Sequence, residues 1–168
     1  SIDSVLRALM IILAEEEAGI VRATADDIGL ALSKLSVLNR LFPIFVVLER
    51  AALMKLNVKK CVVVPTFAKY CLHTVSLIKD LLARLVPAWA NFRIEGSAKY
   101  LGLFLGPCAK GLSWAAPVQK FCTRVVAIAE SQCPAEVAIW QYNSLCVPML
   151  LFVAQVCPLV DSMFALER

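Results

Sequence analysis

The stretch GIVRATADDIGLAL, at residues 19–32, decides how the first part of the chain folds. Short apolar and small side chains flank the charged pair Asp26-Asp27, and aspartate is common in turns but rare in strands. The stretch therefore predicts two short strands that form a hairpin, with Asp26 and Asp27 at its turn. The residues before it repeat apolar side chains at helical spacing, which predicts an amphipathic helix over about residues 2–17, before Gly19.

Beyond the hairpin, alternating helical and strand patterns predict an α+β fold. Ser33 is expected to cap a second helix, in which Pro43 either introduces a kink or begins a new segment. The run KKCVVVPTF, at residues 59–67, is rich in β-branched residues and predicts a strand that ends near Pro65. A third helix is expected over residues 73–90.

The remaining residues predict a second hairpin and then helices. Strand character returns over residues 93–106, with Gly96-Ser97 as the expected turn. From Trp114 onward the spacing is mainly helical, with breaks expected near Cys133-Pro134 and towards Pro158. The α+β region is therefore expected to end near residue 107, and a helical region to follow it.

The composition favours a folded chain with a large apolar core. Of the 168 residues, 60% are hydrophobic and 18% are charged, against about 45–50% and about 25% in a typical domain. Intrinsically disordered chains lack the apolar surface that offsets the entropy of ordering, so the whole chain does not belong to that class. Six glycines, eight prolines and the lack of a sustained repeat exclude collagen-like and low-complexity chains.

Basic side chains are concentrated in the middle of the chain. Residues 31–124 contain 14 basic and 3 acidic side chains, a net charge of +11. The residues before this segment carry a net charge of −4 and those after it −3. A basic segment of this kind is typical of a protein that binds a phosphate backbone. The alternative is a solvated face that only keeps an apolar chain in solution.

The cysteines and the single histidine argue against a zinc site or a disulfide framework. Seven scattered cysteines form no C-x-x-C pair, which favours buried free thiols in a reducing compartment. His73 is the only histidine, so a site with several histidine ligands is excluded. The first residues, SIDSVLRALM, lack the basic start of a secretory signal, so an intracellular location, in the nucleus or cytoplasm, is expected.

One stretch without charge, Val137–Val160, has 24 residues and is long enough to span a bilayer. It contains glutamine, asparagine and proline residues, which are costly or disruptive in lipid. We therefore expect a buried helix with polar side chains here, in preference to a membrane span.

Asp26 and Asp27 are candidate metal ligands. Mg²⁺ prefers hard oxygen ligands and usually takes one or two carboxylates, with substrate phosphates and water completing its shell. In nucleotidyl transfer, two such ions stabilise both the attacking and the leaving oxygen. Adjacent aspartates also occur because they suit a turn, so the pair by itself does not distinguish a metal site from a simple turn.

Three motifs, in their order along the chain, resemble the reverse transcriptases of non-LTR (LINE-type) retrotransposons. They are ATADDIG at 23–29, LNVKKCVVVP at 56–65 and SAKYLGLFLG at 97–106. In that family an aromatic-Ala-Asp-Asp hairpin of the polymerase palm precedes an Asn-x-x-Lys segment and then a Lys-Tyr-Leu-Gly hairpin beside the primer. Trp114, Lys120, Arg124 and the stretch YNSLCVPMLLFVAQ at 142–155 are similar to the thumb-side helices of the family.

The resemblance implies a role for each matching residue. Asp26 and Asp27 would be catalytic and bind Mg²⁺ or Mn²⁺, and Lys60 would neutralise or protonate the leaving pyrophosphate. The other matching residues would bind nucleic acid: Asn57, Lys99, Tyr100, Leu101 and Gly102. For Lys60 the alternative is a solvated lysine at a strand edge, and for Tyr100 it is a half-buried strand aromatic.

The resemblance also implies an architecture and partners. Residues 1–107 would form the C-terminal part of a polymerase palm, and residues 108–168 a helical thumb-like region. The implied partners are an RNA or DNA template–primer, a deoxynucleotide, and upstream palm and fingers regions. The three tryptophans are expected to pack in the core rather than to stack on bases: Trp89, Trp114 and Trp140.

The chain departs from the family pattern in two ways. Thr24 stands where the family has an aromatic residue, so stacking near the incoming nucleotide is altered or lost. Nothing in residues 1–19 matches the family's first metal-binding aspartate, nor the fingers. We therefore expect a polymerase fragment that is inactive alone. The alternatives are a non-catalytic nucleic-acid-binding remnant and, from hydropathy only, a membrane-associated helical protein.

Overall fold

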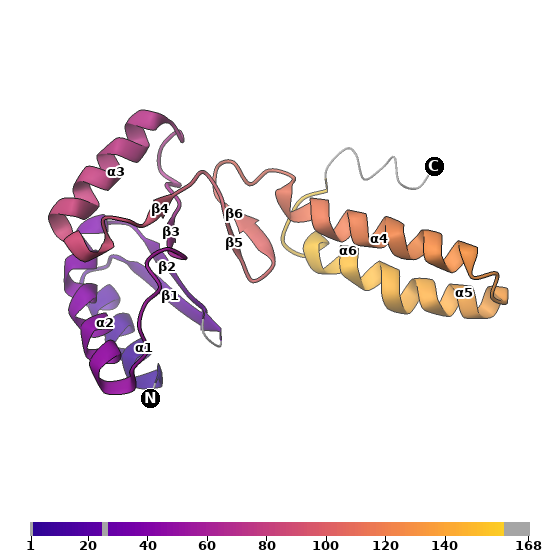
Figure 1. Ribbon diagram of the computed structural model, residues 1–168, viewed down its shortest axis with the longest axis horizontal. Coiled ribbons are helices and arrows are strands. Elements are labelled where there is room, and N and C mark those ends of the chain that lie inside the picture. The colour runs from indigo at the N-terminus through magenta and orange to yellow at the C-terminus, as the bar shows by residue number, and fades with distance from the viewer. Residues whose placement is uncertain (1, 25–26, 160–168) are drawn as a thin grey trace. The chain divides into compact units, whose positions relative to one another are not determined.

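The computed structural model describes residues 2–24 and 27–159, which form a mixture of helices and small sheets. The chain divides into two compact units, residues 1–96 and 97–168. This division falls earlier in the chain than the boundary expected near residue 107. Figure 1 shows the helices and strands of each unit.

Helix α1 (Ile2–Glu15) ends in a hydrogen-bonded motif that turns the chain into the first strand. The backbone N–H of Ala18 donates to the carbonyl of Leu13 at 3.0 Å, and that of Glu17 donates to Ala14 at 3.1 Å. Glu17 takes a left-handed conformation, with a φ of 47°, as the residue after a helix often does. Gly19 follows, where a Cβ atom would lie only 1.9 Å from the carbonyl oxygen of Ala31, so any side chain would clash there.

The predicted hairpin is present. Strands β1 (Gly19–Thr24) and β2 (Asp27–Leu32) pair antiparallel, from Gly19 with Leu32 to Thr24 with Asp27. Helices α1 and α2 lie alongside this hairpin, and α1 contacts both β1 and α2 (Figure 1). Val21 of β1 is buried, which is the expected result for an alternating strand that packs one face on helices.

Helix α2 (Leu38–Ala52) does not begin as the sequence predicts. Ser33 does not cap it: the Ser33 hydroxyl donates to the backbone carbonyl of Glu17 at 3.4 Å. A short 3-10 turn (Leu35–Val37) precedes the helix instead, without a capping side chain. Pro43 lies inside this one continuous helix, so it does not begin a new segment.

The next elements form a β-α-β unit. Strand β3 (Val62–Val63) is shorter than predicted and pairs in parallel with β4 (Arg93–Ile94). Helix α3 (Leu72–Leu85) connects them, followed by a 3-10 turn (Pro87–Trp89). A parallel pair needs such a crossover, because a tight turn can join only antiparallel strands.

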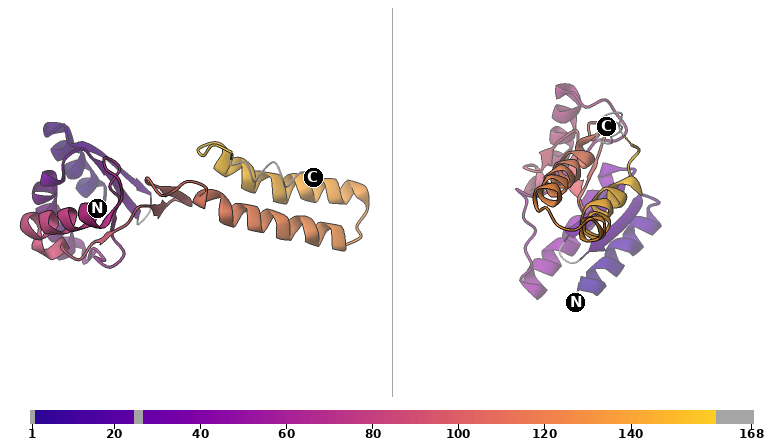
Figure 2. Two further views of the ribbon diagram at one scale, coloured as in Figure 1. Left: turned by 90° about the horizontal axis from the view of Figure 1, so that it is seen from above. Right: turned by 90° about the vertical axis from the view of Figure 1, so that its right-hand side faces the viewer.

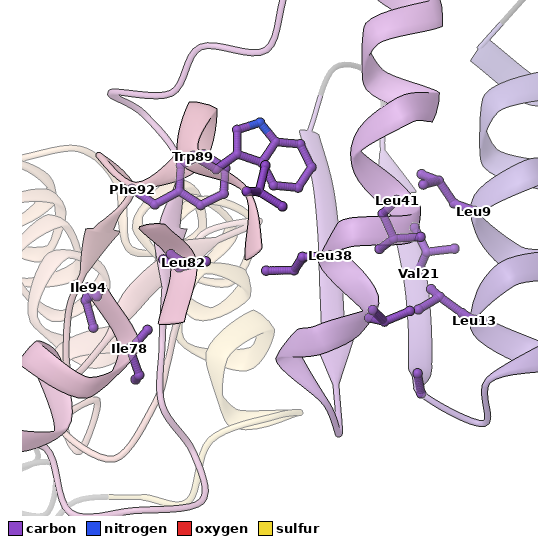
Figure 3. Close-up of a cluster of buried hydrophobic side chains, with 13 residues drawn as sticks. Leu9, Leu13, Val21, Leu38, Leu41, Ile78, Leu82, Trp89, Phe92 and Ile94 are labelled. Carbon is purple, nitrogen blue, oxygen red and sulfur yellow. The ribbon is translucent and has the colours of Figure 1, made fainter. Parts of the chain in front are cut away.

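One apolar core holds the first unit together. Its best-buried members come from α1, β1, α2, α3 and the segment that leads into β4, as the side chains in Figure 3 show. Trp89 is 4% exposed and packs edge-on against Phe42 and Phe45, with ring centroids 5.3 and 5.4 Å away. Phe92 stacks on the ring of Trp89, with the ring centroids 5.3 Å apart.

The second unit begins with a short hairpin whose position corrects the sequence prediction. Strands β5 (Ala98–Tyr100) and β6 (Leu103–Leu105) pair antiparallel around Leu101 and Gly102, so the turn is not at Gly96-Ser97. Both turn residues have positive φ angles, 48° and 89°, as the two-residue turns that suit twisted hairpins require. The preceding strand β4 has β3 as its partner and is therefore not part of this hairpin.

Two helical arms complete the second unit. Helix α4 (Leu112–Glu130) runs beside a second arm made of α5 (Ala135–Gln141), a π-helical turn (Tyr142–Cys146) and α6 (Val147–Ala154), as Figure 2 shows. The break between α4 and α5 confirms the one predicted near Cys133-Pro134. The π turn ends at Cys146, two residues before Pro148, which has no N–H for the helical ladder and crowds the preceding turn.

Hydrogen bonds join the start of α4 to strand β6 and to the segment that follows α6. The indole N–H of Trp114, which is buried, donates to the backbone carbonyl of Pro158 at 2.9 Å. Ser113, also buried, accepts a hydrogen bond from the backbone N–H of Phe104 at 2.8 Å. Trp89 and Trp114 are thus packed as predicted. Trp140 is 66% exposed, so the prediction of a core position is wrong for it.

Two further sequence predictions are wrong: that the thiols are buried, and that the apolar C-terminal helix is buried. The cysteines are free thiols, but Cys146 alone is buried among the seven. In the part of the chain that the structure describes, one helix, Ala135–Ala154, is long and apolar enough to cross a membrane. Only 11% of the most apolar stretch of this helix is buried, so the prediction of a buried helix is wrong. A pair of helices offers each arm one neighbour, and the outer faces stay exposed.

Helix α3 offers a matched test of the core. We expect Leu82→Ala to lower the free energy of unfolding by about 2–5 kcal/mol, because Leu82 is fully buried and its truncation leaves a cavity. Leu77→Ala on the same helix should cost less than about 0.5 kcal/mol, because Leu77 is 54% exposed. Urea denaturation followed by far-UV circular dichroism measures both. Equal effects of the two substitutions would contradict this packing.

Candidate functional site

The first candidate site is the end of the β1–β2 hairpin. Asp27 is the first residue of β2, is exposed, and pairs with Thr24 across the hairpin. Asp26 lies outside the described residues. The hairpin holds Asp27 in place through the partly buried side chains of β2, among them Ile28 and Leu30, which pack against the core.

The carboxylate of Asp27 is compatible with a hydrated divalent cation. Within the described ranges, the Asp27 carboxylate forms no ion pair. The same ranges contain no group of three or more His, Cys, Asp or Glu residues that could hold a metal ion. Mg²⁺ accepts one or two carboxylates when phosphates and water supply its other ligands, so an exposed strand-end carboxylate fits that donor set. The role of Mg²⁺ or Mn²⁺ remains a prediction.

The acidic residues Glu15 and Glu16, which precede the Gly19 end of β1 and not the Asp27 end, are less suited to a cation. Arg40 of α2 pairs with both: its guanidinium lies 3.0 Å from Glu15 Oε2 and 2.5 Å from Glu16 Oε1. These hydrogen bonds, first that to Glu16, raise the pKa of Arg40 above its ordinary value. The pairing ties the end of α1 to α2 and already supplies these carboxylates with a positive partner.

The second candidate site is a turn that carries Asn57 and Lys60. The backbone carbonyl of Asn57 accepts hydrogen bonds from the N–H groups of Lys60 at 2.9 Å and Cys61 at 3.3 Å. Leu56 and Val58 pack against the core, while Asn57 and Lys60 are exposed. The turn therefore presents the amide and the ammonium group to solvent from an anchored backbone. No hydrogen bond or ion pair of the described residues joins Lys60 to Asp27.

The third candidate site is the β5–β6 hairpin of the second unit. Lys99 is exposed and pairs with Phe104, whereas Tyr100 is partly buried and pairs with Leu103. Leu101 and Gly102 form the exposed turn. The four residues of the Lys-Tyr-Leu-Gly motif are thus brought together on one hairpin. The Asp27 hairpin and the Asn57–Lys60 turn belong to the other unit.

The basic residues of the central segment share one property. All fourteen lysine and arginine side chains between residues 31 and 124 are exposed. In the described part of the chain, three of them form ion pairs: Arg40, Lys55 with Glu49 at 3.3 Å, and Arg93 with Glu95 at 3.2 Å. The positive charge is consequently solvated and little neutralised, which leaves it available to an anionic partner.

Cys71 is a chemically distinctive residue that sequence analysis did not single out. It precedes α3 in an extended conformation, is exposed, and its Sγ lies 3.3 Å from Thr74 Oγ1. The Thr74 side chain, and then its backbone N–H, lower the pKa of the Cys71 thiol by hydrogen bonding. The burial of Cys61 raises its pKa instead. The sequence signal for a lowered thiol pKa is a cysteine at a helix start that precedes a threonine by three residues.

The comparisons with known proteins add no family to these observations. None of the protein-family models, curated proteins or solved structures compared with the chain matches it. The three candidate sites therefore depend on the residues and geometry described above.

Manganese binding tests the assignment of the β1–β2 hairpin. Mn²⁺ should bind weakly and broaden resonances near Asp27, because a site with few carboxylates leaves the ion mostly hydrated. Asp27→Asn should remove most of that broadening, whereas Asp80→Asn, at an exposed aspartate of α3, should leave it unchanged. Paramagnetic line broadening in NMR spectra is the measurement. Broadening centred on Glu15–Glu17 would contradict the assignment.

Proposed function

We propose that this chain is the C-terminal palm and the thumb-like part of a reverse transcriptase, and that on its own it binds a primer–template duplex without catalysing extension. The observation that carries the proposal is the central basic segment, in which every lysine and arginine is exposed and most lack an acidic partner among the described residues. Phosphate backbones are the partner to which such a charge distribution is best suited.

The two hairpins support a polymerase over a simple basic surface. An Asp-bearing hairpin between two helices and a Lys-Tyr-Leu-Gly hairpin later in the chain are the elements that the motif resemblance requires. In the proposed role, Asp26 and Asp27 bind Mg²⁺, Lys60 meets the pyrophosphate, and Asn57 binds nucleic acid. Lys99, Tyr100, Leu101 and Gly102 contact the primer backbone.

The proposed fragment is inactive because its metal site is incomplete. A two-metal reaction needs ligands that hold both ions about 3.5–4 Å apart, and the resemblance assigns the chain two of the usual three carboxylates. Bound metal would supply charge stabilisation to the transferring phosphoryl group. The non-catalytic alternative differs only in that the aspartates contribute nothing to binding, so Mg²⁺-dependent duplex binding favours the polymerase fragment.

Salt dependence tests the proposed duplex binding. Affinity for an RNA–DNA duplex should fall with salt at a log–log slope of about −3 to −5, because each phosphate contact contributes roughly 0.7–0.9. Lys99→Ala should reduce the steepness by about one if this lysine meets a phosphate. Tyr100→Ala should weaken binding with little change in slope, because its contact is packing. Fluorescence anisotropy at several salt concentrations measures each.

Lys55→Ala is the matched control for Lys99→Ala. Its ammonium already pairs with Glu49, so its removal should leave the slope unchanged. Salt-insensitive binding, or none at low salt, would reject both nucleic-acid interpretations.

A second candidate, membrane association, is favoured by the exposed apolar helix Ala135–Ala154. We expect less than a tenth of the chain to sediment with neutral lipid vesicles, because Gln141, Asn143 and Pro148 interrupt the apolar surface. Vesicle cosedimentation of the wild type and of Trp140→Asp measures this, since Trp140 is among the most exposed apolar residues of the helix. Strong binding that Trp140→Asp abolishes would favour the membrane candidate.

A further inference from the structure

A cavity in the first unit is lined by two basic side chains outside every motif named above. It has a volume of about 300 Å³ and lies between α3 and the segment that forms β4. Lys79 of α3 and Arg93 of β4 line it, together with Asn91. Its other lining residues are Val75, Ala90, Phe92 and Ile94.

Three side chains of this cavity carry hydrogen-bond donors: Lys79, Asn91 and Arg93. Lys79 forms no ion pair within the described residues, and the side-chain amide of Asn91 forms no hydrogen bond there. Arg93 uses Nη1 for Glu95 Oε1 at 3.2 Å. A guanidinium has five N–H donors, so Arg93 can serve Glu95 and a second acceptor together. The cavity thus offers an ammonium, a guanidinium and an amide to an acceptor.

The wall that carries Arg93 is anchored. The backbone N–H of Arg93 donates to Cys61 at 3.2 Å and that of Glu95 donates to Val63 at 3.1 Å. Phe92 and Ile94, on either side of Arg93, are buried in the core. The backbone below the guanidinium is therefore held by a β-ladder and by packing, and an acceptor need only order the side chains.

The apolar lining increases the attraction between the basic side chains of the cavity and an anion. Coulomb attraction grows as the local dielectric falls, and Val75, Ala90 and Ile94 replace water on one side of the cavity. The negative groups nearby are Glu95, which faces Arg93, and Asp80, which follows Lys79 in sequence. Glu95 is already paired with Arg93, and Asp80 forms no ion pair with Lys79 within the described residues, so the ammonium of Lys79 and the remaining N–H groups of Arg93 are left to bind a small dianion.

We propose that this cavity binds a phosphate group. The group can come from free phosphate, from a nucleotide, or from a nucleic-acid backbone, which share the same charge and acceptor oxygens. The proposal does not rest on the proposed function: a phosphate site can exist without duplex binding, and duplex binding without this site.

The test is a titration of the full chain with inorganic phosphate, at constant ionic strength and about pH 8, where phosphate is mostly a dianion. We expect saturable binding, seen as ³¹P line broadening, with a shift of the Asn91 side-chain amide resonance. Lys79→Gln should weaken binding by about tenfold, because a hydrogen bond to a charged group is lost. Lys34→Gln removes the same charge from an exposed lysine outside the cavity and should have little effect.

Glu95→Gln supplies a test in the opposite direction. It frees Arg93 and removes a negative charge from the cavity, so phosphate should bind several-fold more tightly. Glu49→Gln makes the same charge change at the ion pair with Lys55 and should not tighten binding. Circular dichroism shows that each variant is folded.

Competition identifies the source of the phosphate. A deoxynucleoside triphosphate without metal, and an RNA–DNA duplex, are each added to the phosphate-loaded chain. Displacement by the triphosphate alone assigns the cavity to a nucleotide, displacement by the duplex assigns it to a backbone, and displacement by neither assigns it to free phosphate. Absence of phosphate binding would overturn the proposal. Equal effects of Lys79→Gln and Lys34→Gln, or of Glu95→Gln and Glu49→Gln, would also overturn it.

Discussion

Two-stranded sheets are only marginally stable in water, and this constraint governs the whole structure. The chain forms three of them among its described residues, and each needs helices or loops to cover it. In the first unit, α1 and α2 pack on the β1–β2 hairpin, and Trp89 joins α2 to the segment that leads into β4. The position of Asp27 therefore depends on a core formed by elements far away in sequence.

Charged side chains lie at the surface of this chain, whereas apolar side chains form its core. The core contains almost no polar side chains, and Ser113 is the buried polar residue of the described part. The lysines and arginines of the central segment lie at the surface, where water offsets the cost of their charge. Ion pairs such as that of Arg40 with Glu15 and Glu16 are exposed, so water screens most of their attraction. The surface charge is thus free to serve binding, because stability does not depend on it.

Local sequence signals succeeded where neighbouring residues decide the conformation. Helical spacing predicted α1, α3 and the two helical arms, and the Asp-Asp pair between small residues predicted the β1–β2 hairpin. These signals gave wrong predictions where a residue far away in sequence supplies the strand partner or the hydrogen-bond acceptor. Gly96-Ser97 looked like a turn because β4 and β5 were expected to pair, but β4 pairs with β3 across α3. Ser33 looked like a helix cap, but its hydroxyl reaches the carbonyl of Glu17 instead.

The sequence by itself determined the α+β character, the solvated basic segment and the three motifs, because propensity, periodicity and charge are properties of neighbouring residues. Tertiary structure alone decided which side chains share a site. Lys79 and Arg93 lie fourteen positions apart and line one cavity only because α3 crosses back to place β4 beside β3. Trp114 and Trp140 have equally apolar surroundings in sequence, yet one is buried and the other exposed, since burial depends on which face of a helix meets its neighbour.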